Sequence, residues 1–169
     1  GGSTLTQQLA RDVYRLEGRD IDRKLSEIAA AVRIEKRYSK DEILVHYLNR
    51  IYFGSGFYGL GAAARGYFGK KASELTLDES AMLCGVIPSP SRYSPFVSLA
   101  RARANRDETL RRMSEIGKLD DGELRMSLAK ETKLASSRED SIKRGQIAYL
   151  IGRIERELRV EIASWPEPP

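Results

Sequence analysis

The spacing of apolar residues along the chain predicts a series of amphipathic helices. From Asp20 to about Tyr38, apolar side chains recur every three or four residues, which places them on one face of a helix. These residues are Ile21, Leu25, Ile28, Ala29, Val32 and Ile34. A second run, from Lys40 to Tyr52, groups its apolar residues in the same way. Both stretches are therefore predicted to be helices.

Helix starts are marked by a capping residue that is followed three positions later by Glu or Gln. The cap oxygen accepts from a free backbone N–H of the first turn while the later side chain reaches back to the cap. The pairs are Thr4 and Gln7, Ser39 and Glu42, Thr76 and Glu79, and Asp120 and Glu123. Each pair predicts a helix start.

Prolines and glycines indicate where helices end. Pro88, Pro90 and Pro95 predict an extended, rigid connection, with the preceding helix ending near Val86. The Ala-, Leu- and Arg-rich stretch 98–116 predicts a helix that ends at Gly117, and a last helical pattern covers about 142–162. With no long strand or internal repeat in the sequence, the expected fold class is mainly α.

Composition narrows the function classes. The chain has 169 residues, of which 41% are hydrophobic, as expected for one domain, and its lone Cys84 lies in an apolar run and is expected to be buried. The net charge of +5 suits a phosphate, an acidic lipid surface or a nucleic acid. Nucleic acid is disfavoured, because the basic residues spread over several helices without a pattern of stacking aromatics. No stretch approaches the ~20 apolar residues of a membrane span.

The candidate chemistry gathers near the N-terminus. Arg11, Arg19, Arg23 and Lys24 lie in or just before predicted helices, and free N–H groups beside several cations suit a phosphate or diphosphate. Glu27 projects from the same side of its helix as Arg23 and Lys24. The alternative is a solvated face in which Arg23 and Glu27 form an ordinary pair worth roughly 0.2–0.5 kcal/mol.

Polar side chains at the first helix start allow two interpretations. Ser3, Thr4, Thr6, Gln7 and Gln8 could cap the helix or bind sugar and phosphate, and the pattern does not divide them. His46 is interpreted as a structural or surface residue, since the sequence offers neither a Ser-His-Asp set nor a metal-ligand cluster.

Several motifs then carry a family resemblance. The string from Gly1 to Ala10 resembles the second motif of the peptidoglycan glycosyltransferases (glycosyltransferase family 51), the transglycosylase domains of class A penicillin-binding proteins and their monofunctional relatives. Stretches similar to the later motifs follow in order, at 23–27, 38–49 and 90–95. The resemblance covers residues 1–134, which are expected to form a glycosyltransferase domain that lacks its N-terminal part. Residues 135–169 are expected to be a linker and terminal helix leading to a transpeptidase domain.

The resemblance implies a lysozyme-like helical lobe at the outer, periplasmic face of the bacterial cytoplasmic membrane. Such a lobe polymerises lipid II into β-1,4-linked glycan strands with inversion and releases undecaprenyl diphosphate. The implied partners are lipid II, the growing glycan strand, the membrane surface and cell-wall synthesis proteins, but no nucleic acid. No cofactor is required, although a divalent metal could assist at the diphosphate.

Residue roles follow from the same resemblance. Glu27 matches a catalytic glutamate that assists at the donor diphosphate. The substrate-binding residues are Ser3, Thr4, Gln7, Gln8, Arg11, Arg19, Arg23 and Lys24. The family's general base, a glutamate of its first motif, is expected upstream of Gly1, so this chain by itself is expected to be inactive. Arg11 and Asp12 stand where Lys and Asn are common in the family.

Two other functions stay open at this point. The chain could be a non-catalytic module that binds lipid diphosphate or a partner protein. It could also belong to a lysozyme-like enzyme that cleaves finished glycan, although that reaction would not need a diphosphate site beside the glutamate.

Overall fold

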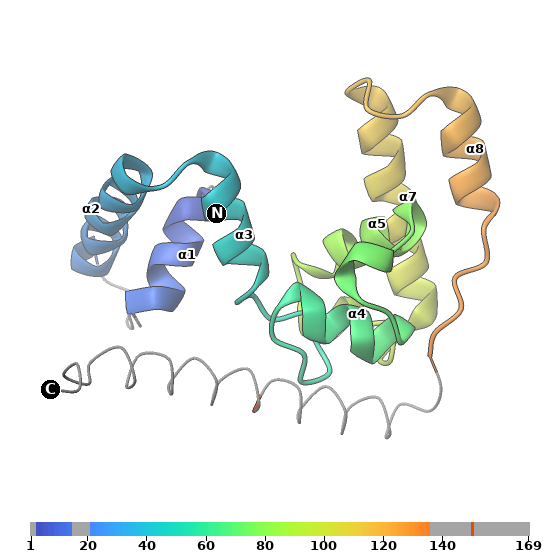
Figure 1. Ribbon diagram of the computed structural model, residues 1–169, viewed down its shortest axis with the longest axis horizontal. Coiled ribbons are helices and arrows are strands. Elements are labelled where there is room, and N and C mark those ends of the chain that lie inside the picture. Colours follow the sequence, from blue (N-terminus) through green and yellow to red (C-terminus); the bar gives the residue numbers. More distant parts are fainter. Residues whose placement is uncertain (1–2, 15–20, 136–149, 151–169) are drawn as a thin grey trace, which may run out of the picture. The chain divides into compact units, whose positions relative to one another are not determined.

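The computed structural model of the chain describes residues 3–14, 21–135 and 150 (Figure 1). The described residues form helices joined by short connections, apart from an isolated bridge between Tyr52 and Tyr58. The chain divides into two compact units, Gly1–Ile51 and Tyr52–Pro169. The expected mainly α fold class is therefore confirmed.

Among its described residues, the first unit has three helices: α1 (Leu5–Tyr14), α2 (Ile21–Arg37) and α3 (Lys40–Leu48). Helix α1 lies between the other two and packs against both, and its Leu9 and Ala10 are fully or almost fully buried (Figure 1). Ser39 and Glu42 form the predicted reciprocal cap at the start of α3. The unit thus packs α1 between two other helices.

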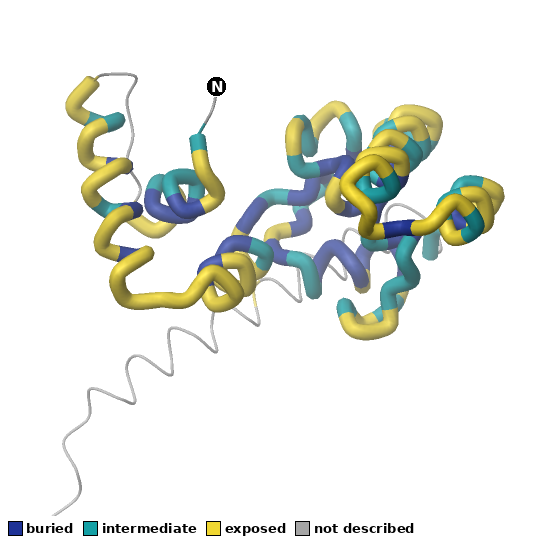
Figure 2. The backbone as a smooth tube through the Cα atoms, turned by 90° about the horizontal axis from the view of Figure 1, so that it is seen from above, coloured by how far each residue is buried: buried dark blue, intermediate teal, exposed yellow. Residues whose placement is uncertain are grey.

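Helix α2 turns a different face inward from the one that its apolar pattern predicts. Its buried residues are Glu27, Ala31 and Ile34, which face α1, whereas Ile21 and Leu25 are 80% and 60% exposed. Figure 2 shows α2 as exposed along most of its length. A glutamate therefore lies on the packed face of α2, while most of the predicted apolar face is exposed.

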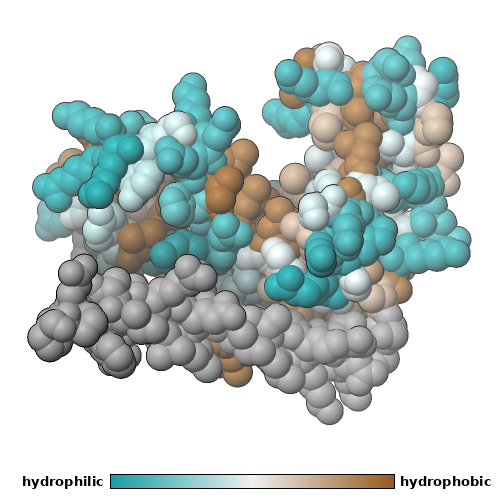
Figure 3. Space-filling view, viewed as in Figure 1, coloured by the Kyte–Doolittle hydropathy of each residue, from teal (hydrophilic) through white to brown (hydrophobic). Residues whose placement is uncertain are grey.

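The described part of the second unit, residues 52–135 and 150, contains six helical segments. They are α4 (Leu60–Phe68), the 3₁₀ turn η1 (Ala72–Glu74), α5 (Leu77–Val86), α6 (Pro90–Tyr93), α7 (Leu99–Glu115) and α8 (Asp121–Ala129). Helix α5 packs along α7, and the two approach closely at Gly85, where an added Cβ would lie 2.9 Å from the carbonyl carbon of Asn105. Apolar side chains follow the seam between α7 and α8 in Figure 3, and Leu110 and Leu119 are buried there.

Some boundaries match the predictions and others do not. Helix α5 ends at Val86 as expected, and α7 spans Leu99–Glu115, close to the predicted 98–116, with Ser98 as its cap. Helix α3 ends at Leu48 rather than Tyr52, because the chain enters a loop in which Gly54 and its two following neighbours have positive φ. An added Cβ at Gly54 would lie 2.5 Å from the Pro90 carbonyl oxygen, so this loop needs a glycine there.

Two expectations about the second unit were wrong. The proline-rich stretch is not extended throughout: Pro90–Tyr93 is a short helix with proline in its first turn, where the missing N–H costs no hydrogen bond. Cys84 is exposed rather than buried, although its neighbours Leu83 and Gly85 in α5 are buried. The last predicted helix, 142–162, lies outside the described residues apart from position 150. Within the described residues, no helix is long and apolar enough to cross a bilayer.

Candidate functional site

Three basic side chains surround Glu27 in the first unit. One carboxylate oxygen, Oε1, forms an ion pair with Arg11 Nε at 3.2 Å and accepts a hydrogen bond from Arg23 Nη1, and the other, Oε2, accepts from Lys24 Nζ at 3.1 Å. Arg11 comes from α1, whereas the other residues come from α2. The contact between these two helices therefore brings together four residues that are separated by up to 16 positions in sequence. We call Arg11, Arg23, Lys24 and Glu27 the Glu27 cluster.

Lys24 is held by three acceptors. Its Nζ lies 2.8 Å from Ser3 Oγ, 3.1 Å from Gln7 Oε1 and 3.1 Å from Glu27 Oε2. Because an ammonium group has three protons, each of its donors has an acceptor within the protein. The position of this charge is consequently fixed from both α1 and α2.

The structure shows which polar side chains at the start of α1 cap the helix and which contact Lys24, a division that the sequence pattern does not give. Thr4 Oγ1 accepts from the Gln7 backbone N–H at 3.2 Å and so caps the helix. Ser3 and Gln7 contact Lys24 instead. Gln8 lies between two protein groups: its Oε1 accepts from Tyr47 Oη at 3.1 Å, and its Nε2 donates to the Ser3 carbonyl at 3.4 Å.

The electrostatics of the Glu27 cluster keep its carboxylate ionised. Burial raises the pKa of Glu27, but the hydrogen bond from Lys24 and the positive charges of Arg11, Arg23 and Lys24 outweigh burial and lower the pKa overall. Three positive charges and one negative charge leave the cluster with a net charge of +2. The cations are accessible, since the side chains of Arg11 and Lys24 are each 42% exposed while Glu27 is 1% exposed.

Arg23 has an unused donor within this cluster. Its Nη1 contacts Glu27, but its Nε is buried and has no hydrogen-bond partner among the described residues. A buried N–H without a partner costs free energy, on the order of 1–3 kcal/mol. Because this atom is not exposed, a phosphate oxygen would satisfy it only after the Arg23 side chain shifts.

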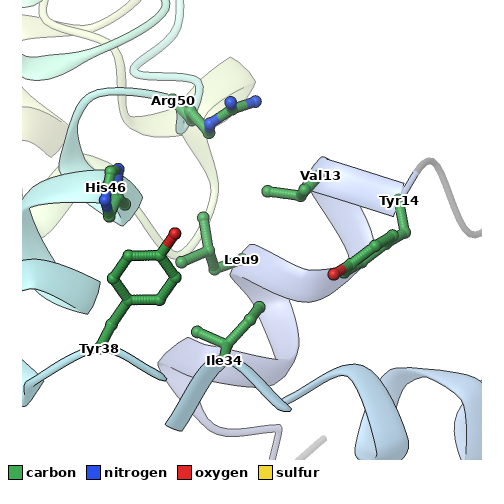
Figure 4. Close-up of a pocket in the computed structure, with 7 residues that line it drawn as sticks. All are labelled: Leu9, Val13, Tyr14, Ile34, Tyr38, His46 and Arg50. Atoms are coloured by element: carbon green, nitrogen blue, oxygen red, sulfur yellow. The ribbon is translucent and has the colours of Figure 1, made fainter. Parts of the chain in front are cut away.

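A separate pocket of about 200 Å³ lies in the same unit. It is lined by Leu9, Val13, Tyr14, Ile34, Tyr38, His46 and Arg50, and none of the candidate site residues is among them. Leu9 and Ile34 lie between the rings of Tyr38 and Tyr14 in Figure 4. His46 is exposed, and its ring makes an edge-on contact with Tyr38.

Two other points concern the predicted set. Arg19 lies outside the described residues. Among the residues that the structure describes, no group of three or more His, Cys, Asp or Glu side chains comes together as a metal site would require. Sequence reasoning missed Tyr47 as a contributor to the site, because Tyr47 falls among the apolar positions of the run from Lys40 to Tyr52. A phenol at a buried helical position is the signal that could have pointed to a polar partner.

Comparison with known proteins relates this geometry to a family. A sequence model of the transglycosylase family matches residues 1–114. The chain is 48% identical over 117 residues to penicillin-binding protein 1A of Escherichia coli (strain K12), an alignment that covers 69% of this chain and 14% of that protein. It is 39% identical over 167 residues to penicillin-binding protein 2D of Bacillus subtilis (strain 168), which covers 99% of this chain and 24% of that protein.

A solved structure agrees with the sequence matches. The crystal structure of penicillin-binding protein 1A from Haemophilus influenzae matches with a TM-score of 0.51 and 26% identity, over 79% of this chain and 17% of that one. The chain thus spans less than a quarter of the length of each of these three relatives. The motifs, the helical fold and the family match agree, and the chain belongs to the transglycosylase family.

Proposed function

We propose that this chain carries the donor-diphosphate site of a peptidoglycan glycosyltransferase, which polymerises lipid II into β-1,4-linked glycan and releases undecaprenyl diphosphate. The observation that supports this most is the Glu27 cluster, with its net charge of +2 on accessible side chains. A diphosphate diester carries about two negative charges, so the charges of site and ligand match. Membership of the transglycosylase family supports the same reaction.

The chemistry assigns different tasks to the cations and to the carboxylate. As the bond from the donor sugar to the diphosphate breaks, negative charge grows on the leaving group, and fixed cations stabilise that charge. Glu27 stays ionised because of its lowered pKa and both of its oxygens are engaged, so it acts by holding the cations in place rather than by donating a proton. The proton of the acceptor hydroxyl therefore needs a base other than Glu27.

We further propose that polymerisation needs no resident cofactor. The oxygens of Glu27 face Arg11, Arg23 and Lys24, so this carboxylate does not fit as a ligand for a divalent metal. The proposed location is the outer face of the bacterial cytoplasmic membrane, in contact with the membrane surface and with cell-wall synthesis proteins. Penicillin-binding proteins among the relatives support a place in the cell envelope.

The experiment is a glycan polymerisation assay on the natural protein with lipid II as substrate. We expect Glu27→Gln to reduce polymer formation sharply, because the cations lose the charge that holds them. Glu35→Gln is the matched control, since Glu35 is an exposed residue of the same helix. Circular dichroism checks that both variants keep their helices. Full polymerisation by Glu27→Gln would contradict the assignment of Glu27.

A binding module is the second candidate function, because the Glu27 cluster has cations for a diphosphate but no free carboxylate to act as a base. The natural protein would then bind lipid II and form no polymer. Cleavage of finished glycan would instead indicate a hydrolytic enzyme. The same assay separates these outcomes through its products.

A further inference from the structure

We propose that Tyr47 is a positioning residue for the diphosphate site and that its hydroxyl acts through Gln8 and Ser3 on Lys24. The inference rests on the proposed function, because it concerns how the same site is held ready for its ligand. Tyr47 contacts none of the residues of the Glu27 cluster through a described hydrogen bond, so its effect is indirect.

A continuous series of contacts links the Tyr47 hydroxyl to the Lys24 ammonium group. Tyr47 Oη donates to Gln8 Oε1 at 3.1 Å, and Gln8 Nε2 donates to the Ser3 carbonyl at 3.4 Å. Ser3 Oγ in turn lies 2.8 Å from Lys24 Nζ. The series therefore runs from α3 through α1 to the ammonium group on α2, and it stays within the first unit.

The orientation of Gln8 is fixed by its neighbours. The Ser3 carbonyl can only accept a hydrogen bond, so the amide nitrogen of Gln8 faces it and the amide oxygen faces Tyr47. Tyr47 is 2% exposed, and burial together with the nearby charge of Asp12 raises its pKa. The hydroxyl thus keeps its proton at neutral pH and serves as the donor. With both ends engaged, Gln8 orients Ser3 instead of reaching toward a ligand.

Ser3 needs such a support because it precedes α1, which begins at Leu5. Its side-chain hydroxyl is one of the three acceptors of Lys24. Loss of the Tyr47 hydroxyl would leave the Gln8 oxygen without its donor and free the amide to rotate, and Ser3 would no longer hold Lys24 in one place. A hydrogen bond of this kind is worth about 0.5–1.5 kcal/mol, which corresponds to roughly 2–10-fold in affinity.

The test is calorimetric titration of the natural protein with inorganic pyrophosphate. Tyr47→Phe removes only the hydroxyl, and we expect it to weaken pyrophosphate binding by roughly 2–10-fold. Tyr38→Phe is the control, because Tyr38 belongs to the same unit and lines the separate pocket. We expect this control to bind as the unaltered protein does.

A second pair of variants distinguishes positioning from a general loss of structure. If Tyr47 acts through Lys24, Tyr47→Phe should cause little further loss in a protein that already carries Lys24→Gln. Equal losses in both backgrounds, or unchanged affinity in the single variant, would overturn the inference while leaving the proposed diphosphate site intact. Failure of the unaltered protein to bind pyrophosphate would overturn the proposed function and this inference with it.

Discussion

Replacing Lys24 with Gln tests the electrostatic reasoning most sharply. Lys24 contributes one of the three positive charges of the Glu27 cluster, and its loss lowers the net charge from +2 to +1. It also removes the donor shared by Ser3 Oγ, Gln7 Oε1 and Glu27 Oε2. Both changes should weaken the binding of a diphosphate.

The size of the effect follows from the exposure of Lys24 and from a separation of about 5 Å, taken as typical of an ammonium group beside a bound phosphate. A charge pair about 5 Å apart interacts by roughly 3 kcal/mol at an effective dielectric constant of about 20. Because the Lys24 side chain is 42% exposed, solvent and salt reduce this value, and about 1–2 kcal/mol is expected. That range corresponds to roughly 5–30-fold weaker binding of the diphosphate.

The assay is titration of the natural protein with pyrophosphate at low and at physiological salt. Lys36→Gln is the matched control, since Lys36 is an exposed residue of the same helix, and we expect it to leave the affinity nearly unchanged. The loss caused by Lys24→Gln should also shrink as salt rises. Equal losses for both variants would refute the reasoning, because long-range net charge would then explain the binding.

Two other predictions concern the second unit. Gly85→Ala should lower the free energy of unfolding in urea by about 1–3 kcal/mol, because the new methyl group would meet the Asn105 backbone. Gly61→Ala is the control and should cost nothing, since an added Cβ there has ordinary space around it. Equal effects of the two substitutions would contradict this packing argument. The free energy of unfolding should be steady at neutral pH and fall as pH drops below about 4–5. Burial raises the pKa values of Asp78 and Glu79, but Lys130 beside Asp78 and Lys70 beside Glu79 outweigh burial. Both pKa values therefore lie below their ordinary 3.8 and 4.5. As pH falls, the unfolded chain takes up protons before the folded chain does, which destabilises the fold. Asp78→Asn should therefore make the decline of the unfolding free energy shallower. An unchanged slope would contradict the role of Asp78.

Local rules predicted much of the fold. Helix α2 spans 21–37, close to the predicted 20–38, although the face that it buries differs from the predicted one. The caps at Ser39 and Asp120 form as expected, since capping needs only residues within one turn. Pro90 shows the limit of such rules: proline excludes a helix interior but not a first turn, and the sequence pattern does not say which one applies.

The candidate site could be predicted only in part. Arg23, Lys24 and Glu27 share one side of a helix, so their proximity follows from spacing alone. Arg11, Ser3 and Gln7 join them through the packing of α1 on α2, a tertiary contact that no local pattern encodes. The pattern also placed the apolar face of α2 inward, whereas Glu27 takes the buried position because three cations compensate its charge.

The most direct test of the central claim compares two ligands on the Arg23→Ala variant of the natural protein. The ligands are a lipid-linked disaccharide diphosphate and the same sugar without the diphosphate. We expect binding of the first to weaken by roughly tenfold or more, because a charge-assisted hydrogen bond is worth about 1.5–3 kcal/mol, and binding of the second to stay unchanged. Equal losses for both ligands would contradict the claim that the Glu27 cluster binds the diphosphate.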